Sequence, residues 1–217
     1  MKGTGTGREL VLASSSPRRV QLLAMLGLPF VQDPSRAEEP LPEAPPGRID
    51  PEDWALRQAL RKARDVARRH PGALVIGADT VVELDGRLLG KPRDADEARA
   101  MLAMLAGREH RVASGVAVVD GRSGRAATGS RLTRVWIRPL TPAEIDAYVA
   151  TGEPMDKAGA YAIQGIGATL VPRIEGCYFN VVGLPLALLA DLLSLFDVQV
   201  LGRAPVRTGR DPGAAGR

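Results

Sequence analysis

The sequence predicts an α/β fold with a mixed sheet, and three observations support this. Helical and strand patterns alternate along the 217 residues. Two long strand patterns, at 110–119 and 129–138, are separated only by a Gly-containing turn at 121–124, so we expect them to be antiparallel. Apolar residues make up 45% and charged residues 25% of the chain, an ordinary globular composition. The length suits one sizeable domain or two small, tightly joined ones.

The first elements are a strand, a helix and a second strand. Residues 10–13 are a short apolar strand that leads directly into a serine- and arginine-rich segment. Pro17 can occupy the first helical position and Ser16 the N-cap, and Gly27 ends the helix. Apolar residues recur every three positions within this helix. Residues 30–32 form the next strand.

A Pro-rich loop over residues 33–51 precedes the second helix, which we expect to extend from residue 51 to about residue 69. Residues 73–82 are β-branched and apolar, apart from two interruptions, and indicate a buried strand. Asp85-Gly86 is typical of a hairpin turn and leads into a short strand over 87–89.

The second half continues the alternation. Residues 94–106 carry an apolar helical stripe, and the two long strands described above follow. Thr141 and Glu144 match a capping box with proline at the first helical position, which predicts a helix to about residue 150. Residues 184–196 are apolar on nearly all sides, so we expect a buried or interface helix.

The positive charge of the chain is concentrated at its C-terminal end. The formal net charge is +4, with a pI of about 9.6. Residues 202–217 hold four arginines and one aspartate and supply +3 of this charge. Their Gly/Pro/Arg composition indicates a flexible basic tail, as the polar residues 1–8 indicate a flexible N-terminus. We therefore expect one domain over residues 9–201 that is nearly neutral. This small net charge argues against a nucleic-acid partner.

Cysteine usage and hydropathy favour a cytoplasmic protein. Cys177 is the single cysteine, so an internal disulfide is excluded, and no Cys/His cluster has zinc spacing. No signal peptide is recognisable at the start of the chain. The most apolar segment, 184–196, is too short to span a bilayer and contains Asp191. We expect no membrane association.

Residues 14–19, Ser-Ser-Ser-Pro-Arg-Arg, are the first candidate site. Free backbone N–H groups and the positive end of a helix dipole favour an anion at such a strand-to-helix junction. Two arginines add bidentate phosphate binding. The alternative is an ordinary capped helix with solvated arginines.

Asp79 interrupts an apolar strand and is the most informative residue. A buried carboxylate is costly, so Asp79 must be paired, metal-bound or exposed at a strand end. A magnesium ligand or a base that activates water meets these requirements. The alternative is an aspartate that caps a turn. Gly77, two residues earlier, would allow close approach by a ligand.

Other polar residues are weaker candidates on their own. Lys91, between a glycine and a proline, could hold a phosphate, although the tripeptide by itself favours a surface lysine in a turn. Gln164, in a Gly/Ala-rich segment, could read a base edge or be structural. Lys62 alone would be a solvated charge on an Arg-rich helix face. Glu38 and Glu39 could complete a metal site, and the alternative is that they are solvated loop acids. Neither a Walker phosphate loop nor a Gly-x-Ser-x-Gly elbow is present, which leaves magnesium, carboxylates and cationic phosphate clamps.

Taken in order, these segments resemble the signature blocks of the Maf, or septum-formation-inhibitor-like, nucleotide pyrophosphatases, over about residues 9–197. The resemblance implies a mixed, elongated sheet, two lobes around a cleft, and a homodimer. It also implies cleavage of nucleoside triphosphates by water between the α and β phosphates, assisted by Mg or Mn. The matching blocks are 14–19, 77–82, 90–92, 156–165 and 180–185.

The resemblance also implies roles for individual residues. Asp79 matches the proposed general base and, with Glu38, the metal site. Glu38 is preferred to Glu39 because of its unbroken distance from the Ser-Pro-Arg-Arg block. The positions tied to substrate choice are Arg18, Thr80 and Gln164, and those of the surrounding phosphate and metal site are Ser14, Arg19, Glu38, Lys62 and Lys91.

The branch of the family can also be predicted. The intact run over residues 156–165 resembles the dTTP and UTP hydrolases. This branch would remove surplus or modified pyrimidine nucleotides, such as pseudo-UTP and 5-methyl-UTP, as a house-cleaning nucleoside triphosphate diphosphatase. Two alternatives stay open: a 7-methyl-GTP pyrophosphatase of the same fold, and a non-catalytic nucleotide sensor that inhibits division. Nothing in these residues explains a link to septum formation.

Overall fold

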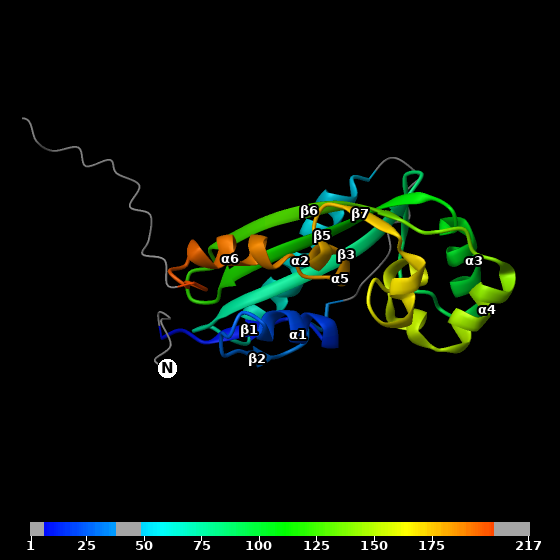
Figure 1. The fold of residues 1–217 in the computed structure, drawn as a ribbon. Helices are drawn as coiled ribbons and strands as arrows, with labels where there is room; N and C mark the ends of the chain where they lie inside the picture. Colours follow the sequence, from blue (N-terminus) through cyan, green and yellow to red (C-terminus); the bar gives the residue numbers. More distant parts are fainter. Residues whose placement is uncertain (1–6, 38–48, 202–217) are drawn as a thin grey trace, which may run out of the picture.

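The computed structural model describes residues 7–37 and 49–201 (Figure 1). It is an α/β fold in which helices flank a mixed seven-stranded sheet, as predicted. The strands are β1 (Leu10–Leu12), β2 (Val31–Gln32), β3 (Leu74–Leu84), β4 (Arg87–Leu89), β5 (Glu109–Asp120), β6 (Ala126–Trp136) and β7 (Arg173–Glu175). The helices are α1 (Pro17–Ala24), α2 (Pro51–Ala67), α3 (Ala95–Leu105), α4 (Pro142–Ala150), α5 (Tyr178–Val182) and α6 (Leu186–Ser194), with the 3₁₀ helices η1 (Glu153–Asp156), η2 (Ala158–Ala160) and η3 (Gly165–Leu170).

The sheet combines a parallel and an antiparallel part. Its strand order is β2-β1-β3-β5-β6-β7, and β4 pairs with β3 beside this path. β1 runs parallel to both β2 and β3. The pairs β3–β4, β3–β5, β5–β6 and β6–β7 are antiparallel. The antiparallel pairing of β5 with β6, which was predicted from the short turn at 121–124, is confirmed.

Successive residues of the sheet face different helices, as the period of two requires. Val75 packs with Ala59, Ala63 and Val66 of α2 on one face. Its neighbour Ile76 belongs to the cluster on the other face, which includes side chains of α1 and α6. The helices that follow β1 and β2 therefore cover opposite faces of the sheet.

Two glycines let α2 lie very close to the sheet. A Cβ atom at Gly77 would come within 2.3 Å of the Ala59 carbonyl oxygen, and one at Gly115 within 2.4 Å of the Ala55 backbone. The expectation that Gly77 admits a ligand is therefore wrong, because the backbone of α2 occupies that space.

The far end of the elongated sheet has its own core. In Figure 1, α3 and α4 lie together at one end of the sheet, whereas α1 and α6 lie toward the other. Side chains of α3, α4 and the end of β3 share a buried cluster that includes Leu102, Ile145 and Val82. This division provides the two lobes that the resemblance implies.

The structure differs from the sequence predictions mainly in short or charged segments. β3 continues to Leu84, two residues beyond the predicted end, because it pairs with β4 as far as Leu84 and with β5 as far as Glu83. β6 begins at Ala126 and ends at Trp136. β7, α5 and the 3₁₀ helices were not predicted, since segments of three to six residues are too short to show a period. In the described residues no helix is both long and apolar enough to cross a membrane.

Candidate functional site

The candidate site lies where the edge of β3 loses its neighbouring strand. β1 pairs with β3 only as far as Ile76, and β4 begins to pair at Val82. Between them, residues 77–81 have no strand partner on that side within the described residues. The opening lies beyond the carboxyl end of β1. The helices that follow β1 and β2 lie on opposite faces of the sheet, and ligands of open α/β sheets bind at such points.

A cavity of about 470 Å³ occupies this opening. Segments far apart in the sequence line it: the start of α1, the inner face of α2, the free part of β3, the 156–164 segment and the end of α5. The lining residues include Arg18, Arg19, Trp54, Gln58, Lys62, Asp79, Thr80, Lys91, Asp156, Lys157, Tyr161, Ile163 and Gln164.

Asp79 points to the face of the sheet covered by α2 and forms an ion pair there. Its Oδ1 atom lies 2.6 Å from Lys62 Nζ. The two side chains are 14% and 6% exposed, so both charges are largely removed from water. Of the three possibilities open for Asp79, the structure therefore shows pairing. Asp79 lies within β3, which excludes both the strand end and the turn cap.

The interpretation of Lys62 as a solvated charge is wrong. Lys62 lies on the buried stripe of α2 with Ala55, Ala59 and Val66, at helical spacing. The close seating of α2 over Gly77 brings the ammonium to Asp79, so a backbone feature creates the contact.

Thr80 points to the other face of the sheet and contacts Arg19. Arg19 donates from Nη2 to Thr80 Oγ1 at 3.1 Å and from Nε to the Gly183 carbonyl at 2.9 Å. Arg19 Nη1 also donates to Ser14 Oγ at 3.4 Å. Ser14 is buried and is absent from the described cavity lining, so its contact with the site is through Arg19.

A fully buried serine supports this arrangement. Ser114 Oγ lies 2.8 Å from Thr80 Oγ1 and donates to the Asn180 carbonyl at 2.9 Å. Sequence reasoning missed Ser114, although it is a polar residue inside the apolar run of β5, the same signal that identified Asp79.

Arg18 links the start of α1 to the 156–164 segment. Its Nη1 atom lies 3.2 Å from Asp156 Oδ2, and Lys157 Nζ donates to Asp156 Oδ1 at 2.6 Å. Lys91 and Gln164 line the cavity as expected. The structure thus gathers Arg18, Thr80 and Gln164, the residues that the resemblance ties to substrate choice, around one cavity.

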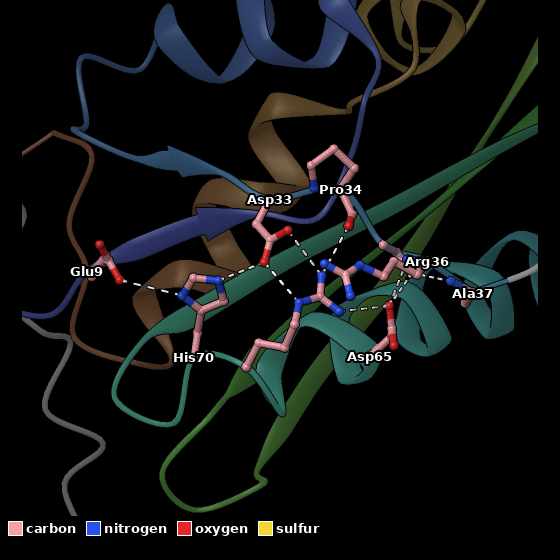
Figure 2. A network of polar contacts seen from close by, with 9 residues as sticks. Glu9, Asp33, Pro34, Arg36, Ala37, Asp65 and His70 are labelled. Carbon is pink, nitrogen blue, oxygen red and sulfur yellow. Dashed lines mark hydrogen bonds and ion pairs between the residues drawn. The ribbon is translucent and has the colours of Figure 1, made fainter.

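A polar network fixes the segment that follows β2 to the end of α2 (Figure 2). Arg69 holds Asp33 with two hydrogen bonds of 3.1 Å, and Asp65 accepts the Arg36 backbone N–H at 2.9 Å. Hydrogen bonds from Arg69 and His70 lower the pKa of the Asp33 carboxyl to about 2. The network holds residues 33–37 in place. Glu38, the next residue, lies outside the described residues, so its role stays a prediction.

The second histidine is structural. His110 is buried, and its Nε2 atom lies 2.7 Å from the hydroxyl of Tyr161, a residue of the cavity lining. Burial lowers the pKa of His110 to about 4, which keeps the ring neutral at neutral pH.

The model of the Maf-like protein family matches residues 9–196. The chain belongs to the Maf family. It is 55% identical to the dTTP/UTP pyrophosphatase of Moorella thermoacetica over 197 residues, which cover 90% of this chain and 98% of that one. A dTTP/UTP pyrophosphatase of Pelotomaculum thermopropionicum is 52% identical over 89% of this chain and 100% of its own. That of Gloeobacter violaceus is 51% identical over 88% and 97%.

The charges of the Maf cavity suit a polyphosphate. Among the described residues of the lining, five are cationic (Arg18, Arg19, Lys62, Lys91 and Lys157) and two are acidic (Asp79 and Asp156). An excess of positive charge in a concave site attracts anions, and arginines bind phosphate oxygens in pairs.

Maf pyrophosphatases generally depend on a divalent metal. The described residues of this Maf chain contain no group of three or more His, Cys, Asp or Glu side chains that could hold one. Magnesium, however, is commonly bound by one or two carboxylates together with substrate phosphates. Asp79 at the cavity supplies such a carboxylate, so the donor set fits a cation shared with the substrate.

Proposed function

We propose that this chain hydrolyses dTTP and UTP, and modified pyrimidine nucleotides of the same shape, to the monophosphate and pyrophosphate. The single observation that carries the proposal is the buried Asp79–Lys62 pair, which lies in a cavity lined by Arg18 and Arg19. The identity of about half with dTTP/UTP pyrophosphatases over nearly the whole chain supports the choice of substrate.

The cationic side chains bind and neutralise the triphosphate. Arg19 is fixed by Thr80 and the Gly183 carbonyl, so its guanidinium is oriented before substrate enters. Lys62 and Lys91 add point charges from α2 and from the segment after β4. Phosphoryl transfer depends mainly on positioning and on stabilising charge, which a preorganised cationic set provides.

Asp79 acts as the general base. Lys62 contacts only one of its two carboxylate oxygens, Oδ1, so the other can accept a proton from water. The water oxygen forms a bond to the α-phosphorus, and the bond from that phosphorus to the oxygen bridging to the β-phosphate breaks. Pyrophosphate leaves, and the proton passes to Asp79. Asp79 and Glu38 would hold a magnesium or manganese ion, which neutralises phosphate charge when bound.

Base recognition belongs to the 156–164 segment and to Thr80 and Arg18. Gln164 carries a donor and an acceptor on one amide, which matches the imide edge of uracil and thymine. The 7-methyl-GTP alternative requires the same wall to accept a purine, and the sensor alternative predicts binding without turnover.

A substrate panel tests the proposal. Purified protein with Mg²⁺, and separately with Mn²⁺, is incubated with dTTP, UTP, CTP, GTP and 7-methyl-GTP, and kcat/KM is measured for each. We expect dTTP and UTP to be the best substrates. Preference for 7-methyl-GTP would support the alternative branch, and binding of UTP without turnover would support the sensor.

Two further proposals concern the setting of the enzyme. We place the reaction in the cytoplasm, where nucleoside triphosphates are made and used. We also propose a homodimer, for which light scattering coupled to size-exclusion chromatography is the test. A mass of one chain, 23.0 kDa, would contradict the dimer.

A further inference from the structure

A carboxylate and a phenol hold both ends of the arc that carries Gln164. We define the arc as residues 162–167. The backbone N–H of Ala162 donates to Tyr148 Oη at 3.1 Å. At the other end, Ile166 N–H donates to Glu153 Oε2 at 3.0 Å and Gly167 N–H to Glu153 Oε1 at 2.8 Å.

The two anchoring groups also bind each other. Tyr148 Oη donates to Glu153 Oε1 at 2.9 Å while it accepts the Ala162 N–H. We call this pair the Glu153–Tyr148 clamp. It belongs to α4 and η1, in the lobe away from α1, and the polar contacts described above for Arg19, Lys62 and Asp79 do not include it.

Two glycines of the arc fit closely against the clamp. A Cβ atom at Gly165, where φ is +65°, would come within 2.5 Å of Glu153 Oε2. A Cβ atom at Gly167 would come within 2.5 Å of Tyr148 Oη. Larger residues would displace the clamp or the arc, so the sequence of the arc is matched to the clamp.

The protonation states of the clamp favour these hydrogen bonds. Burial raises the pKa of Glu153, but backbone hydrogen bonds from Gly167 and Ile166 outweigh burial and hold it below its ordinary value. Burial, followed by the hydrogen bond to Glu153, raises the pKa of Tyr148. At neutral pH an ionised acceptor thus meets a protonated phenol.

Fixing the arc has a chemical consequence for base selection. Uracil presents an N–H donor beside a carbonyl acceptor, and cytosine presents a ring nitrogen acceptor beside an amino donor. An amide side chain that rotates by 180° can pair with either arrangement. Gln164 therefore discriminates only if its amide is held in one orientation at the base edge. A fixed arc sets the backbone position from which this amide reaches that edge.

We propose that Glu153 and Tyr148 are positioning residues that set the preference for uracil and thymine over cytosine by fixing the arc beneath Gln164. The inference rests on the proposed function. It adds a second group of residues, which do not line the cavity, to the determinants of substrate choice.

The test measures selectivity and stability in the same variants. Glu153→Gln keeps the shape of the side chain, but its NH₂ group replaces one of the two carboxylate oxygens and cannot accept, so one of the two backbone N–H donors loses its acceptor. Tyr148→Phe removes only the phenolic oxygen. The control is Asp146→Asn, which removes an exposed charge of α4 that pairs with Arg99. For each protein, kcat/KM is measured with UTP and CTP, together with the melting temperature.

We expect Glu153→Gln and Tyr148→Phe to lower the UTP-to-CTP ratio of kcat/KM by about tenfold or more, because small displacements of a positioning group have large kinetic effects. Asp146→Asn should leave the ratio unchanged. In a Gln164→Ala background, Glu153→Gln should change the ratio by less than about twofold, because residues that act through one another are not additive.

Three results would overturn the inference. A variant that melts earlier but keeps the wild-type ratio would show that the clamp is only structural. Additive effects of Glu153→Gln and Gln164→Ala would show that Glu153 does not act through Gln164. If the wild type hydrolyses UTP and CTP equally well, there is no preference for the clamp to set and the inference fails alone. If it hydrolyses neither, the proposed function fails as well.

Discussion

Asp79 and Thr80 are neighbours in the chain, but their side chains make contacts on opposite faces of the sheet. Because side chains alternate along β3, Asp79 meets Lys62 of α2 and Thr80 meets Arg19 of α1. Both still line the cavity, since the edge of β3 is uncovered there. Two consecutive residues thus present a carboxylate and an arginine-bound hydroxyl to one cavity.

The role of Asp79 gives the first prediction. Asp79→Asn keeps the size of the side chain but removes the proton acceptor, so kcat with UTP should fall by roughly 10²-fold or more. Steady-state kinetics with UTP measures this, and circular dichroism checks that the variant is folded. Near-normal turnover in a folded variant would exclude Asp79 as the base.

Single residues also show where the sequence is informative. Asp79 could be recognised because a carboxylate inside an apolar strand requires a partner. Lys62 carried a comparable signal, its position on the alanine stripe of α2, which the surrounding arginines obscured. The pairing of Arg18 with Asp156 joins residues 138 positions apart, and no local pattern specifies such a contact.

At the scale of elements, the position of α2 over the sheet determines the site. Gly77→Ala would place a Cβ atom 2.3 Å from the Ala59 carbonyl and push α2 away. We expect a loss of about 1–3 kcal/mol in the free energy of unfolding, typical of overpacking, together with lower activity as Lys62 moves from Asp79.

Denaturant unfolding and UTP hydrolysis measure the two effects of Gly77→Ala. Gly72→Ala is the matched control, because a Cβ atom there has no neighbour within 4 Å and the position has no positive φ. Equal stability of the two variants would show that the sheet and α2 tolerate the added methyl group, contrary to this account.

The network between β2 and α2 makes stability depend on pH. The pKa of Asp33 is lowered from 3.8 to about 2 in the folded protein, so its ionised form stabilises the fold. This stabilisation is complete above about pH 4 and is lost as the pH falls through 2. Asp33→Asn should therefore lower the free energy of unfolding at pH 6. The loss should be on the order of 1 kcal/mol, because the network is partly exposed and solvent screens its charges.

Urea unfolding at several pH values tests this prediction. The difference between wild type and Asp33→Asn should be greatest at pH 6 and should nearly vanish close to pH 2. Asp146→Asn, which removes an exposed carboxylate of α4, serves as the control. A difference that does not depend on pH would mean that Asp33 stabilises the fold by shape rather than by charge.

Elements differ in how well they could be predicted. Caps and periodicity identified the long elements, and α4 has the predicted capping box of Thr141 and Glu144. The predicted cap of α1 is wrong, because Ser16 occupies the N-cap position but its side chain accepts no helix N–H, and its own N–H donates to Ser14 Oγ. The 3₁₀ turns around Glu153 depend on contacts between separate segments, so local patterns could not predict them.

For the whole molecule, the fold class and the mixed sheet followed from the order of the elements, and the division into two ends was implied by the family resemblance. The cavity did not, because it exists only where β1 stops and β4 has not begun. The positive charge of the chain is likewise a poor guide to function. Residues 202–217 contribute most of the net charge, whereas five cationic residues are among the described residues that line the cavity.

We infer that this cavity directs water to the bridge between the α and β phosphates. Hydrolysis of UTP that carries a label in its γ-phosphate, with the products separated by chromatography, tests this. We expect labelled pyrophosphate and unlabelled UMP in equal amounts. Labelled orthophosphate with UDP would show that the γ-phosphate is cleaved instead and would overturn the inference.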